Sequence, residues 1–239
     1  MLEKGEVSIF FRPLYLLLQY FYFFKFSIYF YIFFDNIESE VISILTILTL
    51  FLIFPTSSFA YSIAKTTSGQ TIYGLRDSSI TFQSWNGFTQ ETRWAIDYAS
   101  RQWNSRTGQT KLFHSPTQHG EENKPAVTDG RNLITKVPTI INSNEGVTLM
   151  RTYIRCDIYD SKYKIYEADI VMNNSVAWRN NGGTGGFDVQ NVMTHEFGHM
   201  LGLGHSDVTG ATMVQGTYYG DISKRTLEQD DINGFNAIY

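Results

Sequence analysis

Hydrophobic positions are concentrated in two runs at the start of the chain. From Ile9 to Phe34 almost every residue is aromatic or aliphatic, and about 20 such residues are enough to cross a bilayer as a helix. A buried core helix is the alternative, but so many Phe and Tyr side chains would need a very large core. The second run, Val41 to Phe54, has the length of a signal-peptide apolar core. Residues 9–54 therefore favour contact with a membrane.

A signal-peptidase site follows the second run. Ser58 and Ala60 are small residues at the spacing that this enzyme needs, so we expect cleavage after Ala60. The stretch before the second run is acidic, however, where a signal peptide is normally basic. Either residues 1–40 are an upstream extension that does not belong to the protein, or the protein keeps an N-terminal membrane hairpin. Both interpretations make residues 1–60 a membrane or signal region and carry the rest of the chain across a membrane.

Residues 61–239 show the mixed periodicities of a folded domain, and they are numerous enough for one domain with its own core. Polar and apolar residues alternate over residues 79–82, as in a half-buried strand. Thr89 can cap a helix that runs to about Arg106, and Gly108 can end it. The buried stripe of this helix is predicted to consist of Thr92, Ala95, Ile96, Ala99 and Trp103.

Three segments rich in Ile, Val, Thr and Tyr predict strands further along the chain. They cover Leu133–Val137, Thr148–Asp157 and Lys164–Met172. Residues 114–131, which precede them, are polar and turn-rich, so we expect a mobile surface loop there. Residues 180–186, which follow them, are rich in Asn and Gly and predict a flexible connector. This connector lacks the lysine and the glycine spacing of a phosphate-binding loop.

Two further helices are predicted after the connector. Asp188 is placed to cap the first, which runs through Val189–Leu201. The second begins at Thr226, which can form a capping box with Gln229, and continues to the C-terminus. Its apolar side consists of Ile232, Phe235 and Ile238.

Charge and cysteine content exclude several kinds of site. The chain has 19 Lys+Arg against 23 Asp+Glu, a net charge of −4. A nucleic-acid-coating protein would show a basic excess, so we expect no nucleic-acid partner. Cys156 is the only cysteine, which excludes an intramolecular disulfide framework and thiolate-rich sites such as iron–sulfur clusters.

The predicted helix over 189–201 carries the residues of a metal site. His195 and His199 are four residues apart, so both imidazoles leave the same helix face one turn apart. This spacing lets two nitrogens meet one zinc ion at about 2.0–2.1 Å. Gly202 can take the left-handed conformation that ends a helix and turns the chain back. His205 can then return as a third ligand.

Three protein ligands leave a fourth position for water, which is the pattern of a catalytic zinc site. Zinc lowers the pKa of that water to about 7, and Glu196, beside the first ligand, can take its proton and pass it to the leaving amine. Three of the five histidines in the chain lie in this segment. A core that packed three unpaired imidazoles and a glutamate would be costly, so a zinc site is favoured.

The segment HEFGHMLGLGHS resembles the zinc signature of the metzincin metalloproteases, and specifically of the matrixin (matrix metalloproteinase-like) family. Ser206 follows the third histidine, as in that family, and Met213 falls where the family places the Met-turn, a methionine beneath the zinc site. Residues 230–239 match its C-terminal helix, whose aspartates tie that helix to the Met-turn or to the mature N-terminus. The resemblance covers roughly residues 78–239.

The resemblance implies an α+β catalytic domain over residues 61–239, with a twisted, mixed, five-stranded sheet and three helices. It implies one catalytic zinc ion and protein or peptide substrates, with calcium left open because no calcium site is recognisable. An extended peptide is expected to pair with the strand Tyr166–Met172. Val192 matches a pocket-lining position, and Tyr218 is a candidate for the same pocket. We expect a monomer that acts outside the cell.

The chain departs from the family pattern in several places. The region of the structural metal sites is shortened, and only His114 and His119 remain, far upstream, so we expect no second zinc. No propeptide cysteine switch is present, and Cys156 is expected to be a small buried hydrophobe. The Pro–x–Tyr wall after the Met-turn is replaced by residues 214–218.

Two alternatives to an endopeptidase stay open. In the first, the chain is a catalytically silent zinc-binding extracellular interaction domain. In the second, it is a zinc hydrolase that acts on something other than peptides. The intact Glu196 argues against the first, and the Met-turn with the terminal helix argues against the second. Because the chain ends with that helix, no hemopexin-like or other targeting module is expected after it.

Overall fold

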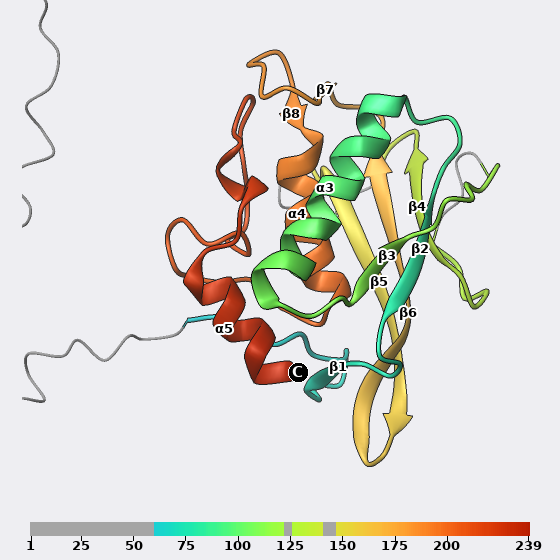
Figure 1. Cartoon of the computed structure of the whole chain (residues 1–239), viewed down its shortest axis with the longest axis vertical. Helices are drawn as coiled ribbons and strands as arrows, with labels where there is room; N and C mark the ends of the chain where they lie inside the picture. The colour runs from blue at the N-terminus through green and yellow to red at the C-terminus, as the bar shows by residue number, and fades with distance from the viewer. Residues whose placement is uncertain (1–59, 122–125, 141–146) are drawn as a thin grey trace, which may run out of the picture. The chain divides into compact units, whose positions relative to one another are not determined.

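A computed structural model of the chain describes residues 60–121, 126–140 and 147–239 (Figure 1). The two apolar runs predicted to contact a membrane lie outside these residues, as does Ser58 of the predicted cleavage site. Within the described ranges, no helix combines the length and the apolar character that a membrane span requires.

One mixed sheet forms the scaffold, and β6 lies in its interior. The strand β5 pairs antiparallel along β6, and β1 and β4 pair parallel with β6. The parallel part continues from β4 to β2 and β3, so the order is β1-β6-β4-β2-β3. The strands are β1 (Ile72–Leu75), β2 (Ile80–Ser84), β3 (Leu112–His114), β4 (Asn132–Val137), β5 (Met150–Tyr159) and β6 (Lys162–Asn173).

The sheet order corrects the prediction that Tyr166–Met172 pairs with substrate. This segment lies within β6, whose hydrogen-bonding groups are already used by β5 on one side and by β1 and β4 on the other. In contrast, β5 pairs only with β6 among the described strands, so β5 is an edge strand. The interior strand cannot accept an added peptide without losing one of its partners.

Three α-helices complete the domain, and α3 and α4 lie against one face of the sheet (Figure 1). This arrangement confirms the α+β fold with a mixed sheet and three helices, and the short β1 extends the sheet by one strand. The helical elements and the small second sheet are α3 (Gln90–Thr107), α4 (Val189–Met200), α5 (Gln229–Ile238), the 3₁₀ turn η1 (Ser223–Arg225), β7 (Trp178–Arg179) and β8 (Phe187–Asp188).

The ends of α3 are set by local side-chain chemistry. Thr89 Oγ1 accepts the Thr92 backbone N–H at 3.2 Å, and Gly108 takes the left-handed conformation with φ 69°. Every residue of the predicted stripe is buried. At the far end of the helix, the Trp103 indole donates to the Thr194 carbonyl at 2.8 Å. The sequence prediction of this helix is therefore confirmed, and α3 holds α4 directly.

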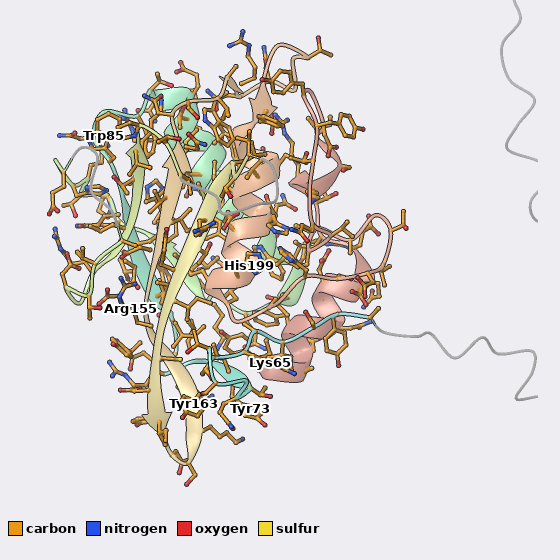
Figure 2. The ribbon with its side chains drawn as sticks, turned by 180° about the vertical axis from the view of Figure 1, so that it is seen from behind. Lys65, Tyr73, Trp85, Arg155, Tyr163 and His199 are labelled. Atoms are coloured by element: carbon orange, nitrogen blue, oxygen red, sulfur yellow. The ribbon has the colours of Figure 1, made fainter. Side chains whose placement is uncertain are left out.

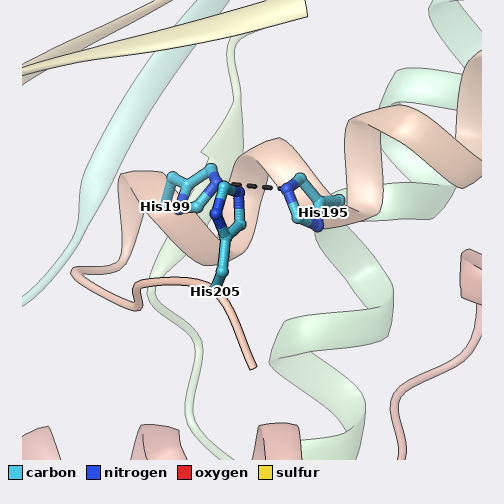
Figure 3. A group of neighbouring side chains, drawn as sticks. All are labelled: His195, His199 and His205. Carbon is cyan, nitrogen blue, oxygen red and sulfur yellow. Dashed lines mark hydrogen bonds between the residues drawn. The ribbon is translucent and has the colours of Figure 1, made fainter. Parts of the chain in front are cut away.

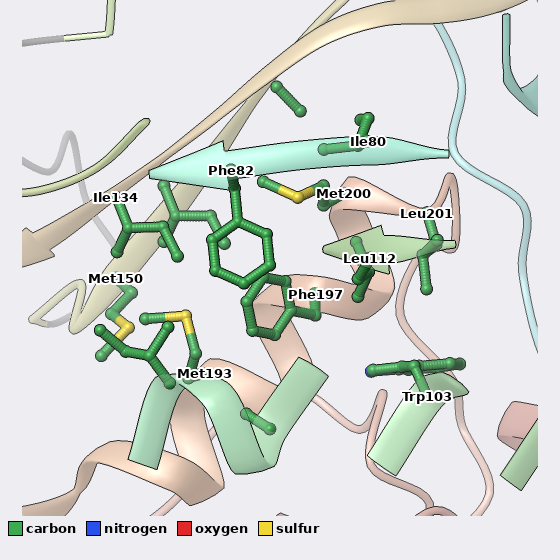
Figure 4. Packing of buried hydrophobic residues seen from close by; sticks show 14 of the residues in the cluster. Ile80, Phe82, Trp103, Leu112, Ile134, Met150, Met193, Phe197, Met200 and Leu201 are labelled. Atoms are coloured by element: carbon green, nitrogen blue, oxygen red, sulfur yellow. The ribbon is translucent and has the colours of Figure 1, made fainter. Parts of the chain in front are cut away.

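The core lies between the sheet and the two helices (Figure 4). Phe82 of β2 and Phe197 of α4 pack with ring centroids 5.0 Å apart, and both are fully buried. Met193 and Met200 are buried on the same helix. Cys156 lies partly buried against this core, and burial raises the pKa of its thiol. The core packing of Met193, Phe197 and Met200 thus fixes the orientation of α4 against the sheet.

The described part of residues 114–131 lies mostly at the surface, as predicted, and is anchored to the sheet at several points. His119 is buried, and its Nε2 donates to the Ile134 carbonyl at 3.0 Å. The buried carboxylate of Glu167 accepts the backbone N–H groups of Asp129 and Gly130 at 3.3 and 2.7 Å. These contacts tie the surface segment to β4 and β6.

Helix α5 begins later than the pattern predicts. Its N-cap is Glu228, which forms a capping box with Asp231, and not Thr226 with Gln229. The backbone N–H of Glu228 donates to Asp231 Oδ2 at 2.9 Å. Thr226 is extended, and its carbonyl accepts the Thr212 hydroxyl at 2.9 Å. This tertiary contact holds residue 226 outside the helix.

Candidate active site

Three imidazoles converge on one point beside α4. His195 and His199 leave the helix one turn apart, with 3.1 Å between their Nε2 atoms, and His205 approaches from the following turn (Figure 3). One possible ligand atom from each of the three lies within 4.8 Å of the others. A tetrahedral zinc ion with bonds of about 2.0–2.1 Å places its ligand nitrogens about 3.3 Å apart. The donor set and its spacing therefore fit a single zinc ion.

Backbone carbonyls fix the orientation of the two helical histidines. His195 Nδ1 lies 2.8 Å from the Thr212 carbonyl, and His199 Nδ1 lies 2.8 Å from the Leu203 carbonyl. A carbonyl can only accept, so each Nδ1 carries the proton and each Nε2 keeps its lone pair for a metal. Burial lowers the pKa of both imidazoles, which favours their neutral form.

The turn that returns His205 is held by the start of the domain. Gly202 has φ 98°, as predicted from its position after the helix. The Gly204 N–H donates to the Ser62 carbonyl at 2.8 Å, and the Ser62 hydroxyl donates to the His205 carbonyl at 2.5 Å. Sequence reasoning missed this role of Ser62, because no local pattern links residues 143 positions apart.

The three histidines differ in how far they are buried. His195 is buried, His199 is partly buried and His205 is exposed. In the view from behind, His199 lies between Trp85 at one end of the sheet and Tyr73 and Tyr163 at the other (Figure 2). The site is therefore open to solvent on the side of His205.

Glu196 lies beside the histidines and is held by the edge strand. It is 6% exposed, and its Oε2 accepts the Thr152 hydroxyl of β5 at 2.6 Å. Burial raises the pKa of Glu196 to about 7, against the opposing effect of the Thr152 hydrogen bond. Glu196 and the three histidines line one cavity of about 670 Å³. Sequence reasoning did not identify Thr152, which is 44 residues away.

We expect Thr152→Val to lower kcat/KM for peptide cleavage about 10-fold, because a hydrogen bond to a charged group is worth about 1.5–3 kcal/mol. The substitution keeps the shape of the side chain and removes only the donor to Glu196. Zinc content should stay the same. Tyr153→Phe is the matched control, because Tyr153 is the exposed neighbour on the same strand. Equal kinetics for the wild type and Thr152→Val would contradict a positioning role.

Met213 packs against Gly198 of α4, in a turn held by several hydrogen bonds. It is buried, and its backbone N–H donates to Asp231 Oδ1 at 3.0 Å. The Thr212 N–H donates to Asp231 Oδ2 at 2.8 Å, while the Thr212 carbonyl accepts from His195. The neighbouring Asp230 accepts the Ser206 hydroxyl at 2.7 Å and the Ala60 N–H at 3.2 Å. Helix α5 is thus bonded both to the Met213 turn and to the start of the domain.

Gly198 provides the space for this methionine. A Cβ atom at residue 198 would lie 2.2 Å from Met213 Sδ and 2.8 Å from the Trp103 ring. In an ordinary helix, Gly→Ala stabilises by up to about 1 kcal/mol. Here we expect Gly198→Ala to destabilise the domain by about 1–3 kcal/mol, because it overpacks the core.

Thermal unfolding of the zinc-loaded domain checks the sign of this change. Gly120→Ala is a suitable control, because its added Cβ would meet only Asn86 Nδ2, at 3.7 Å. A Gly198→Ala protein with a Tm equal to or above that of the wild type would show that the helix and the Met213 turn are not closely packed.

Of the two predicted substrate-pocket residues, Val192 lines the cavity and Tyr218 does not. Val192 is buried in α4 and lines the cavity beside His195. Tyr218 is 70% exposed and is not among the lining residues. Its neighbour Tyr219 packs edge-on against Phe187, which does line the cavity, with ring centroids 4.5 Å apart. The opposite wall is formed by residues 147–152 and 154.

Comparison with known proteins agrees with this geometry. A family model described as Matrixin matches residues 87–239, more than half of the chain. Human neutrophil collagenase is 50% identical over 48 residues, which cover 20% of this chain and 10% of that protein. Horse interstitial collagenase is 48% identical over 54 residues (22% and 11%). Soybean metalloendoproteinase 1 is 45% identical over 60 residues (23% and 18%). Each alignment thus spans less than a fifth of the relative's length. The extent of the family match, over the same residues that form the fold and the site, shows that the chain belongs to the matrixin family.

Proposed function

We propose that this protein is a zinc-dependent endopeptidase that hydrolyses peptide bonds in proteins outside the cell. The observation that carries the proposal is the convergence of His195, His199 and His205 on one point, with Glu196 in the same cavity. Membership of the matrixin family supports the metalloprotease chemistry. Two of the similar proteins are named collagenases and a third a metalloendoproteinase, which supports protein substrates.

The roles of the residues follow from their positions. The three histidines present neutral nitrogens that would hold zinc, which supplies an acidic water and polarises the peptide carbonyl when bound. Glu196 takes a proton from the attacking water and delivers it to the nitrogen of the leaving amine. Thr152 orients the Glu196 carboxylate, and the Met213 turn orients His195 through the Thr212 carbonyl. Val192 forms part of the substrate pocket.

We further propose that an extended peptide binds along β5. This strand has a free edge among the described strands, and its residues 150–152 and 154 line the cavity that contains Glu196. Addition of a peptide to a sheet edge supplies main-chain hydrogen bonds and leaves alternate side chains to enter pockets. This edge therefore replaces β6 as the expected substrate strand.

Cleavage of the chain after Ala60 and export are also proposals. They rest on the signal-like run and the small residues before Tyr61. Cleavage there would remove Ala60, whose N–H donates to Asp230 Oδ1 at 3.2 Å, and leave Tyr61 as the new terminus. N-terminal sequencing of protein recovered from culture medium should find Tyr61 first.

Digestion of an unfolded protein tests the proposed function. Purified chain should cut reduced, denatured casein, stop when a zinc chelator is added, and recover when zinc is restored. Cleavage that survives complete metal removal would contradict the proposal. A domain that binds zinc and leaves casein intact would favour the alternative, a catalytically silent zinc-binding extracellular domain.

A further inference from the structure

One wall of the active-site cavity is polar and contains a buried lysine. Next to His195, this wall consists of Asn191 from α4, residues 215–217 and Lys224 from η1. Lys224 is only 7% exposed, yet it is one of the residues that line the cavity. A buried ammonium group is costly unless it is paired with a negative charge or well hydrogen-bonded.

The hydrogen bonds of Lys224 use only part of its capacity. Its Nζ donates to the Val214 carbonyl and, at 2.6 Å, to the Gly216 carbonyl. An ammonium has three donors, so one remains. No carboxylate lies within ion-pair distance of Nζ in the described part of the chain. Asp221, Asp231 and Glu196 act on the ammonium only at longer range, and Asp221 accepts the Thr217 hydroxyl and the Ser223 N–H.

A network of hydrogen bonds holds this wall in place. The Lys224 backbone N–H donates to Asn191 Oδ1 at 2.7 Å, and Asn191 Nδ2 donates to Thr217 Oγ1 at 3.1 Å. The Thr217 hydroxyl donates to Asp221 Oδ2 at 2.7 Å. The ammonium group is thus positioned before any substrate arrives, which lowers the entropic cost of using it for binding.

The charge of the cavity is positive apart from the catalytic group. Among the described residues that line it are Arg151 and Lys224, and Glu196 is the only carboxylate in that set. Such a cavity attracts a negatively charged group and repels a positive one.

We propose that Lys224 is a specificity-determining residue, and that the enzyme prefers substrates with an Asp or Glu side chain next to the cleaved bond. The substrate carboxylate accepts the remaining N–H of Lys224 and supplies a directly bonded negative charge. This inference rests on the proposed function, because it names the substrate class of the same site. The competing role for Lys224 is purely structural: its ammonium would only hold the segment Val214–Gly216 in place through the two carbonyls that it contacts.

Matched peptides test the proposal with the unmodified protein. One sequence that the enzyme cuts is prepared with Glu, Gln or Leu at each position that flanks the cleaved bond. Glu and Gln have the same shape, so their ratio of kcat/KM isolates the charge. At one of the two positions, we expect Glu to exceed Gln by at least about 10-fold, as for a charge-assisted hydrogen bond. Equal values for Glu and Gln at both positions would overturn the proposal.

Lys224→Met separates specificity from structure. It keeps most of the length of the side chain and removes the charge, so the ratio of Glu to Gln should fall to about one. A structural role would lower cleavage of all peptides together and leave the ratio unchanged, which would overturn the proposal. Arg101→Gln is the control, because Arg101 is an exposed cation paired with Asp97 on α3. If Lys224→Met does not fold, the ratio of kcat/KM for the Glu and Gln peptides in the wild type decides whether the proposal holds.

The casein assay distinguishes failure of this inference from failure of the proposed function. A protein that cuts casein but does not prefer acidic residues is an endopeptidase without this specificity. A protein that cuts neither casein nor any peptide while fully loaded with zinc contradicts both.

Discussion

Replacing Glu196 with Gln is expected to lower kcat/KM for peptide cleavage by about 10²–10⁴-fold, the usual contribution of a general base. Gln has nearly the same shape, and its amide oxygen can still accept the Thr152 hydroxyl. It cannot take a proton from the attacking water. The proposed zinc ligands are the three histidines and not Glu196, so zinc binding should persist. Steady-state kinetics on a peptide substrate, with metal analysis of the same samples, checks both parts.

Two outcomes would contradict the role of Glu196. One is a Glu196→Gln protein that retains the kcat/KM of the wild type, because proton transfer would then rest on another group. The other is a protein that has lost its zinc together with its activity, because the loss would then report on the metal site. His199→Ala serves as the reference for metal loss, since it removes a proposed ligand directly.

The second large effect is expected at the start of α4. The fully buried carboxylate of Asp188 accepts the Asn191 N–H at 2.9 Å and the Gly182 N–H at 3.0 Å. It also forms a bidentate pair with Arg225, at 2.8 and 2.6 Å. Asp188→Ala removes the helix cap and leaves Arg225 without its buried partner. We expect a loss of about 3–5 kcal/mol in the free energy of unfolding, measured by denaturant titration.

An exposed ion pair provides the comparison for Asp188. Arg101 and Asp97 lie 2.8 Å apart on the surface of α3, and such i,i+4 pairs contribute about 0.3–0.5 kcal/mol. Arg101→Ala should therefore leave the free energy of unfolding nearly unchanged. If Asp188→Ala costs no more than Arg101→Ala, the pair with Arg225 does not anchor the start of α4.

Local sequence signals predicted the elements that carry the chemistry. Thr89 and Asp188 cap their helices as expected, because a cap depends on residues three positions away. The left-handed conformation of Gly202 follows from glycine's freedom to take a positive φ at the end of a helix. The short strands β1 and β3, of four and three residues, were not identified, because they are too short to show a period.

The remaining features depend on contacts between distant residues. Thr226 is kept out of α5 by Thr212, although its spacing to Gln229 suits a capping box. The contacts of Thr152 with Glu196 and of Ser62 with the His205 turn join segments that are far apart in the sequence. Lys224 has no motif at all, and only the fold brings it to the cavity. Periodicity also cannot show that β5, and not β6, is the free edge.

The most direct test of the central claim is a titration of metal-free protein with zinc, in which bound zinc and cleavage of a peptide are measured on the same samples. If three histidines hold one zinc ion that the enzyme uses to cut peptide bonds, cleavage should rise in proportion to bound zinc. It should reach its maximum at one zinc ion per chain. Saturation at one zinc ion with no cleavage, or full cleavage before any zinc is bound, would contradict the account.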